Sequence, residues 1–228
     1  MMISHSRRFV FVKTKKTAGT SIECALAPYL RRGDLTSPLE EHEPKYRRFS
    51  KEMVRILREK DGNIRARNPH LPASVVHEHF ANDTAGYFSF CVERNPWDKA
   101  VSAFYFWISR HPVSRQNTEE ENFKNFVQSD RLSFFSDFDL YMQDGEPLVD
   151  RILSYENLAD EFSEVMTQVG LPNVSIRKMN AKTEQRPKAA RSLKRYFGDD
   201  FDNPAAERVR SVFAREIEYF GYTPPMPG

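Results

Sequence analysis

Apolar positions in this chain fall into short aromatic or β-branched runs and longer stretches with one apolar face. The short runs predict buried strands at about residues 8–13, 86–93 and 149–158. The amphipathic stretches predict helices at about residues 20–29, 45–60, 72–80, 97–107, 158–170, 192–197 and 204–220. Because strand, loop and helix recur in this order, we expect an α/β fold with a central, mainly parallel sheet flanked by helices.

Length and composition narrow the class of protein. With 228 residues the chain is long enough for a sizeable core, and we expect one domain over residues 1–228. Hydrophobic residues make up 39% and charged residues 29%, as in a globular fold with a well-solvated surface. The 34 basic and 32 acidic residues nearly cancel, whereas proteins that coat nucleic acid usually carry a strong basic excess. We therefore expect no nucleic-acid partner.

The pattern also bears on location. No apolar run approaches the length of a membrane span, and the first residues lack the apolar stretch of a signal peptide. Cys24 and Cys91 lie among apolar neighbours and are expected to be reduced core thiols. We expect a cytoplasmic protein without a stable membrane anchor, and nothing in the pattern indicates an oligomeric state.

The string KTKKTAGTSIE joins the first predicted strand to the following helix. Backbone N–H groups of Ala18, Gly19 and Thr20 are expected to face a ligand at the helix N-terminus, where the dipole favours an anion. The hydroxyls of Thr20 and Ser21 add donors, and Lys16 supplies a mobile positive charge. In a Walker A loop the lysine follows a second glycine, so this order of residues indicates a different phosphate-like group. A capped helix beside a solvated lysine would account for the same residues.

A second junction, ERNPWDKAVS, follows the strand at 86–93. Arg94 leaves the carboxyl end of this strand, where open α/β sheets bind ligands, and its guanidinium fork suits phosphate. Ser102 lies on the helix that follows. The structural alternative is an ion pair of Arg94 with Asp98 or Glu93. Two anion sites at the ends of two strands imply a ligand with two separated anionic groups.

These junctions resemble those of sulfotransferases. FVFVKTKKTAGTSIE is similar to their 5′-phosphosulfate loop, in which PKTGGTS or KTAGTS follows the first strand, and FCVERNPWDKAVSAFYFW resembles their 3′-phosphate segment. HLPAS resembles the H-x-P-A string of bacterial members, and RILSYENLADEF and EIEYFGY are similar to later landmarks. The resemblance runs from Phe9 to about Tyr222. The chain departs from the family pattern at Lys13, Lys15, Glu93 and Lys99.

The resemblance implies a P-loop-like fold and transfer of a sulfuryl group from 3′-phosphoadenosine 5′-phosphosulfate (PAPS) to a hydroxyl, with 3′-phosphoadenosine 5′-phosphate (PAP) as product. The residues that it places on the donor are Lys16, Thr17, Ala18, Gly19, Thr20, Ser21, Arg94 and Ser102. Lys16 would also meet the charge that develops on the leaving group. The acceptor would be a small alcohol or, by resemblance alone, a carbohydrate.

Transfer to a hydroxyl needs a base, and His70, His77 and His79 are the candidates. The resemblance favours His70, the histidine of HLPAS, and the other two remain alternatives. A metal is not expected, because residues two apart on a helix do not share a face and no Cys or Asp cluster accompanies HEH.

Two other functions stay open at this point. A P-loop nucleotide-dependent kinase is one, since Thr17 follows Lys16 directly; the single glycine and the lack of an apolar strand ending in Asp weaken it. A non-catalytic nucleotide-binding protein is the other, and the presence of both Lys16 and a candidate base speaks against it.

Overall fold

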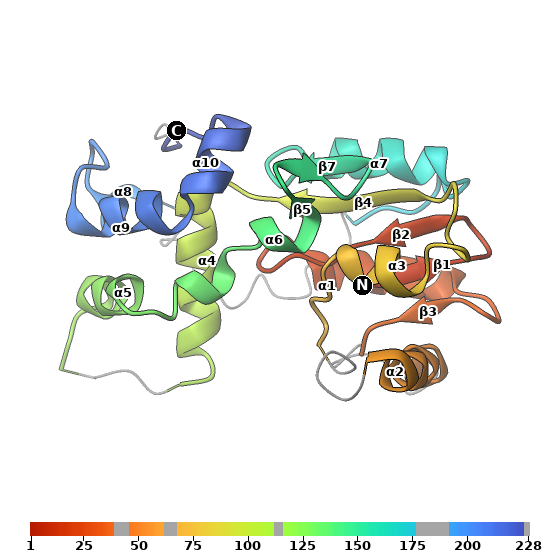
Figure 1. Cartoon of the computed structure of the whole chain (residues 1–228). Coiled ribbons are helices and arrows are strands. Elements are labelled where there is room, and N and C mark those ends of the chain that lie inside the picture. Colours follow the sequence, from red (N-terminus) through yellow and green to blue (C-terminus); the bar gives the residue numbers. More distant parts are fainter. Residues whose placement is uncertain (39–45, 62–67, 112–115, 177–191, 226–228) are drawn as a thin grey trace. The chain divides into compact units, whose positions relative to one another are not determined.

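A computed structural model describes the chain over residues 1–38, 46–61, 68–111, 116–176 and 192–225. The chain forms two compact units (Figure 1). Unit 1 consists of Met1–Glu93 and Asp139–Ala181, and unit 2 of Arg94–Phe138 and Lys182–Gly228. A single domain over residues 1–228 stays a prediction.

Unit 1 contains the sheet. Its elements, in chain order, are β1 (Met2–Ser4), β2 (Phe9–Phe11), α1 (Gly19–Leu26), the 3-10 helix η1 (Ala27–Tyr29), β3 (Leu35–Thr36), α2 (Arg47–Asp61), α3 (Ser74–His79), β4 (Phe88–Glu93), β5 (Met142–Gln143), β6 (Glu146–Pro147), β7 (Arg151–Ser154) and α7 (Leu158–Gln168). The short helix α6 (Phe138–Tyr141) begins at the end of a unit 2 segment and continues into unit 1.

Five strands of the described residues form one sheet in the order β3-β1-β2-β4-β7. β2, β4 and β7 are parallel neighbours, with Phe9 opposite Phe88 and Phe90 opposite Arg151. β1 is antiparallel to β2 and to β3, so it runs against the other strands of this sheet. The predicted α/β fold with a mainly parallel sheet is therefore confirmed. β1 and β3 were not predicted, because three and two residues are too few to show an alternating pattern.

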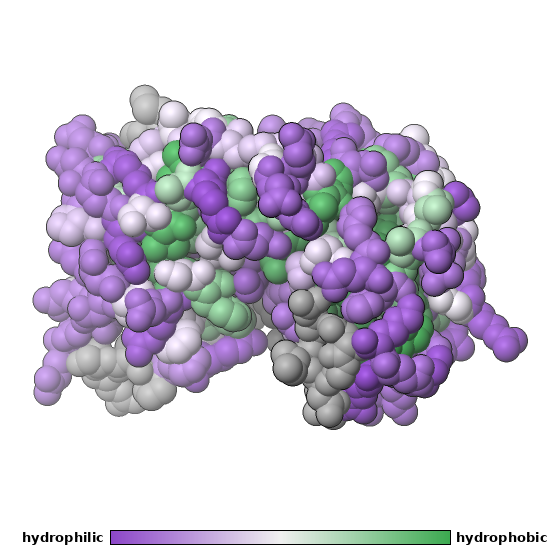
Figure 2. All heavy atoms as spheres, viewed as in Figure 1, coloured by the Kyte–Doolittle hydropathy of each residue, from purple (hydrophilic) through white to green (hydrophobic). Residues whose placement is uncertain are grey.

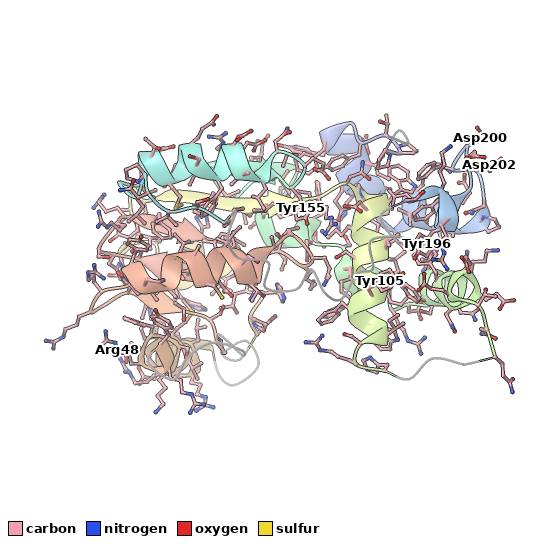
Figure 3. All side chains as sticks on the ribbon, turned by 180° about the vertical axis from the view of Figure 1, so that it is seen from behind. Arg48, Tyr105, Tyr155, Tyr196, Asp200 and Asp202 are labelled. Carbon is pink, nitrogen blue, oxygen red and sulfur yellow. The ribbon has the colours of Figure 1, made fainter. Side chains whose placement is uncertain are left out.

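The core of unit 1 lies between the sheet and two helices. α1 and α7 cover one face of the sheet, as Figures 1 and 3 show from opposite sides. Ile22 and Leu26 of α1 and Phe162 of α7 are buried there against Phe11 and Phe90 of the sheet. This packing holds the carboxyl ends of β2 and β4, from which both predicted junctions leave.

α2 confirms the charged helix predicted at 45–60. Phe49, Met53 and Leu57 recur at four-residue intervals and are buried, which places one apolar stripe against the unit. The other side of the helix is rich in charged residues, and Figure 2 shows hydrophilic side chains gathered over it. Arg55 forms ion pairs there with Glu52 and Glu59.

Unit 2 is helical over its described residues. Its elements, in chain order, are α4 (Pro96–Ile108), α5 (Glu119–Gln128), the 3-10 helix η3 (Ser133–Phe135), α8 (Lys194–Phe197), α9 (Pro204–Val212) and α10 (Ala214–Phe220). An aromatic core joins them, with Phe104, Phe123 and Phe197 all buried. α5 was not predicted, although Thr118 followed by Glu121 is a capping-box signal that the structure shows in use.

The helix predicted at 204–220 is wrong as a single element. α9 ends at Val212 and α10 begins at Ala214, with Phe213 between them fully buried in the core of unit 2. Past this break, buried Glu216 accepts hydrogen bonds from Ser136 Oγ at 2.7 Å and from the Asp137 N–H at 3.3 Å. At this break the Phe213 ring is buried and the Glu216 carboxylate accepts two hydrogen bonds. Hydrophobic periodicity predicts neither contact.

Among the described residues, no helix combines the length and the apolar character that crossing a membrane requires.

Candidate active site

The loop between β2 and α1 turns at Lys16 and Ala18. Both adopt the left-handed backbone conformation, with φ of 61° and 60°, which residues other than glycine rarely adopt. Ala18 is the N-cap of α1, and its carbonyl accepts the Ile22 N–H at 3.1 Å. Left-handed residues in such loops help to turn N–H groups towards an anion, and the helix N-terminus adds its dipole. The predicted donor-binding residues 16–21 thus lie in one continuous loop and first helical turn.

Thr14 anchors this loop to β4, and Thr17 is bound in turn to Thr14. Thr14 Oγ1 donates to the Val92 carbonyl at 2.5 Å and lies 2.7 Å from Thr17 Oγ1. The Thr17 hydroxyl also donates to the Thr14 carbonyl at 3.2 Å, and Thr17 is fully buried. Since these contacts engage the hydroxyl inside the loop, we expect Thr17 to contact an anion through its backbone N–H.

Lys13 is buried, and its role differs from that of an added surface charge. Its Nζ lies 2.5 Å from Glu23 Oε2 on α1, and both side chains are nearly inaccessible to solvent. The Met1 nitrogen lies 3.6 Å from the other Glu23 oxygen. Gly19 packs directly on the Lys13 side chain, because a Cβ at Gly19 would lie 2.7 Å from Lys13 Cγ. The Lys13 side chain therefore leaves no room for a Cβ at Gly19 unless it shifts.

His70 is in contact with the same loop. Its ring nitrogen Nδ1 lies 2.9 Å from the Lys13 carbonyl oxygen, and its main-chain N–H donates to Asn68 Oδ1 at 2.9 Å. A carbonyl oxygen can only accept, so Nδ1 carries the proton in this hydrogen bond. A neutral imidazole then has its lone pair on Nε2, the atom that a general base needs.

The alternative histidines are placed differently. His77 is exposed on α3, and its Nε2 lies 3.2 Å from the Leu148 carbonyl. The main-chain carbonyl of His79 accepts a hydrogen bond from Lys60 at 2.5 Å. Across the ranges that the structure describes, no three His, Cys, Asp or Glu side chains come together as metal ligands.

Arg94 opens the second junction and lies in unit 2. Its side chain is 7% exposed, and Nε and Nη2 contact Asp98 Oδ2 at 2.8 and 2.5 Å. This is the structural alternative considered above, and it orients the guanidinium on α4. Asn95 caps α4 by accepting the Trp97 N–H at 3.2 Å, and its amide donates to the Thr223 carbonyl at 2.9 Å. Both ends of the RNPWD turn are thereby held.

Ser102 follows on the same helix. It is partly exposed and lies one turn beyond Asp98 on the same side of α4, and Asp98 is the residue that contacts the Arg94 guanidinium. Lys99 points elsewhere: its Nζ lies 3.0 Å from Asp137 Oδ2, and both side chains are completely buried. The basic residue after Trp-Asp is therefore part of the interior of unit 2.

The predicted site residues divide between the two units. Lys16, the loop that follows it and His70 belong to unit 1, whereas Arg94 and Ser102 belong to unit 2. Each group is ordered within its own unit. Their assembly around one ligand stays a prediction.

Comparison with known proteins identifies the family. The family model for the sulfotransferase domain matches residues 2–171, well over half of the chain, and this stretch includes both junctions. The chain belongs to the sulfotransferase family.

A related protein that this chain matches carries no functional description. An uncharacterized protein of Archaeoglobus fulgidus is 36% identical over 90 residues, which cover 38% of this chain and 71% of that protein. No solved structure matches the chain.

Two carboxylates, Glu23 and Glu93, make contacts in unit 1 that the local sequence does not predict. Glu23 forms the ion pair with Lys13. The one feature of the sequence that points to such a pair is an acidic residue on the buried side of the helix after the loop. Glu93, at the end of β4, is buried and accepts a hydrogen bond from the Tyr141 hydroxyl at 2.7 Å. Glu93 departs from the family pattern, and local sequence does not predict its tyrosine partner, which lies 48 positions away along the chain.

Proposed function

We propose that this sulfotransferase moves the sulfuryl group of PAPS to a hydroxyl-bearing acceptor, a carbohydrate or a small alcohol, without a metal. The observation that supports this best is a lysine, Lys16, in a left-handed loop directly ahead of a helix N-terminus, with His70 hydrogen-bonded to the same loop. An anion-binding loop, a mobile cation and an oriented imidazole are the three parts that in-line sulfuryl transfer requires.

In this reaction Nε2 of His70 takes the proton of the acceptor hydroxyl while the hydroxyl oxygen bonds to sulfur. The bond between sulfur and the bridging oxygen breaks, and PAP leaves with the negative charge on its 5′-phosphate. Lys16 meets that charge as it develops, so it acts mainly in the transition state. The N–H groups of residues 17–21 bind the 5′ end of the donor, and Arg94 and Ser102 bind its 3′-phosphate.

The kinase alternative is less well supported. A P-loop kinase uses the hydroxyl after its lysine to hold a metal ion, whereas the Thr17 hydroxyl lies 2.7 Å from Thr14 Oγ1 and is buried. A side chain engaged in anchoring the loop is poorly placed for a metal. This favours sulfuryl transfer over metal-dependent phosphoryl transfer.

A ligand-binding experiment tests whether PAPS is the sulfuryl donor. PAP at roughly 100 times its Kd should raise the free energy of unfolding by about 2.7 kcal/mol, measured by thermal shift, and Mg·ATP should not. Equal binding of PAP and of adenosine 5′-phosphosulfate, which lacks the 3′-phosphate, would refute the role of Arg94 and Ser102. Stabilisation by Mg·ATP alone would favour the kinase.

An assay of sulfuryl transfer tests whether His70 is the general base. A panel of carbohydrates, small alcohols and phenols with radiolabelled PAPS identifies an acceptor, and activity should survive EDTA. His70→Ala should then lower kcat by about 10²–10⁴-fold with PAP affinity nearly unchanged. His77→Ala is the matched control and should keep most activity. The reverse outcome, with loss in His77→Ala or in His79→Ala, would assign the base to that residue.

A further inference from the structure

We propose that Lys13 is a positioning residue that couples the donor loop to the base: its buried side chain ties the loop to α1, and its carbonyl holds His70 in the tautomer with Nε2 unprotonated. This deepens the proposed function, since it explains how the base is oriented. The proposal combines three contacts of one residue, made by its ammonium, its side-chain stem and its carbonyl.

The ammonium fixes where Lys13 lies. Lys13 is 9% exposed and Glu23 1% exposed, and the 2.5 Å contact between Nζ and Oε2 joins the end of β2 to the first turns of α1. A buried charge is costly without its partner, so either side chain alone would have to move or take up water. The pair therefore constrains the backbone on both sides of the loop.

The stem of Lys13 fixes the other side of the loop. Gly19 leaves room for Lys13 Cγ and Cε, which would lie 2.7 and 3.4 Å from a Cβ at that position. The first residue of α1 thus rests on the lysine side chain. Lys16 and Ala18, the two left-handed residues, lie between these anchors in sequence, so their strained conformations are held from both ends.

The carbonyl of Lys13 orients His70 through a hydrogen bond to its ring. Because an oxygen acceptor at 2.9 Å from Nδ1 requires a proton there, it selects one of the two neutral tautomers of the ring. The same hydrogen bond stabilises the imidazolium that forms when Nε2 takes a proton, since Nδ1 is a donor in both states. A shift of the Lys13 backbone that lengthens this bond lets the other tautomer become populated.

Nitrogen NMR of the histidine ring tests the tautomer without any substrate. In protein labelled with ¹⁵N-histidine, the His70 signals are assigned by their loss in His70→Gln, at a pH where the ring is neutral. The wild type should show the Nδ1–H form. Lys13→Met keeps an unbranched stem but removes the ammonium, and it should give a mixture of tautomers, whereas Lys15→Met should match the wild type.

A double variant keeps the test decisive if Lys13→Met does not fold. Lys13→Met with Glu23→Met removes both members of the ion pair and leaves no unpaired carboxylate. The third group of this cluster is the Met1 amine, whose pKa burial lowers to about 5, so it needs no carboxylate partner at neutral pH and the double variant should fold. It should also show mixed tautomers. An Nε2–H form in the wild type, or an unchanged Nδ1–H form in the folded double variant, would overturn the proposal. If the wild type shows the Nδ1–H form but transfers no sulfuryl group, the proposed function fails and the positioning role stands.

Discussion

The carbonyl oxygen of Lys13 lies 2.9 Å from Nδ1 of His70, so the residue at the start of the proposed donor loop also contacts the candidate base. The two residues are 57 positions apart in the chain, and the contact forms within unit 1. Lys13 therefore contacts both the proposed donor loop and the candidate base. Changes in the loop are expected to affect proton transfer as well as donor binding.

Lys16→Ala should lower kcat far more than it weakens PAP binding, because its charge is needed as the leaving group becomes negative. Steady-state kinetics and calorimetry with PAP separate the two effects. The matched control is Lys15→Ala, an adjacent, partly exposed lysine. Lys13 is unsuitable as a control because it is buried against Glu23. Equal, small losses in both variants would contradict the role of Lys16.

Arg94→Ala should weaken PAP by about 1.5–3 kcal/mol, the cost of losing a charge-assisted contact to phosphate. Ser102→Ala should cost less, since a neutral hydroxyl makes a weaker bond. Calorimetry should show that neither variant changes the affinity for adenosine 5′-phosphosulfate. If Arg94→Ala weakens both ligands equally, its main effect is on the RNPWD turn that it forms with Asp98.

Gly19→Ala should destabilise the chain by about 1–3 kcal/mol and weaken PAP, because the new Cβ would lie 2.7 Å from Lys13 Cγ. Urea unfolding and PAP titration measure the two effects. Ala18→Gly is the control: it removes a side chain at a left-handed position and should keep PAP binding. Normal stability and binding in Gly19→Ala would show that the Lys13 side chain can move aside.

Lys99→Met should lower the free energy of unfolding by about 3–5 kcal/mol, because Asp137 loses a cation in a fully buried pair. Adding Asp137→Leu should recover much of the loss, since no buried charge is then left over. Chemical denaturation measures both. Arg55→Ala, in an exposed set of ion pairs, should cost less than about 1 kcal/mol. A small effect of Lys99→Met would contradict the stabilising role of this buried pair.

Tyr105 and Tyr196 should make unit 2 sensitive to alkali. Their hydroxyl oxygens are 2.6 Å apart, and each lies within hydrogen-bond distance of Glu119 Oε1; Figure 3 labels both tyrosines. Burial, together with Glu119, raises the pKa of Tyr105 to about 12. Burial, the hydrogen bond with Tyr105 and then Glu119 raise the pKa of Tyr196 still further. The folded state thus keeps protons that unfolded tyrosines release at about pH 10.

The resulting contribution to the free energy of unfolding is complete below about pH 10 and falls as the pH rises above it. Urea unfolding across this range should show a smaller alkaline loss for Tyr196→Phe than for the wild type. Ultraviolet titration should also show tyrosine absorbance that appears late or only on unfolding. Identical alkaline losses in both proteins would contradict the assignment.

Local sequence determined the strands at β2, β4 and β7 and most helices, because hydrophobic periodicity and flanking turn residues act over a few positions. It also predicted the two junctions that are proposed to bind anions, since the order of Lys16, Gly19 and Ser21 is read directly from the chain. It did not predict the short strands β1 and β3, because three and two residues are too few to show an alternating pattern. It did not predict the break at Phe213 either, because that residue is buried among residues from distant parts of the chain.

Only the tertiary structure decided what the charged residues do. Lys13, Lys16 and Lys99 look alike as lysines, yet folding buries the first against Glu23 and the last against Asp137 and leaves Lys16 partly exposed. Burial turns an ammonium from a solvated charge into one that requires a partner, and burial is a property of the whole fold. The contact of His70 with the donor loop arises in the same way, because it joins residues that only the folded chain brings together.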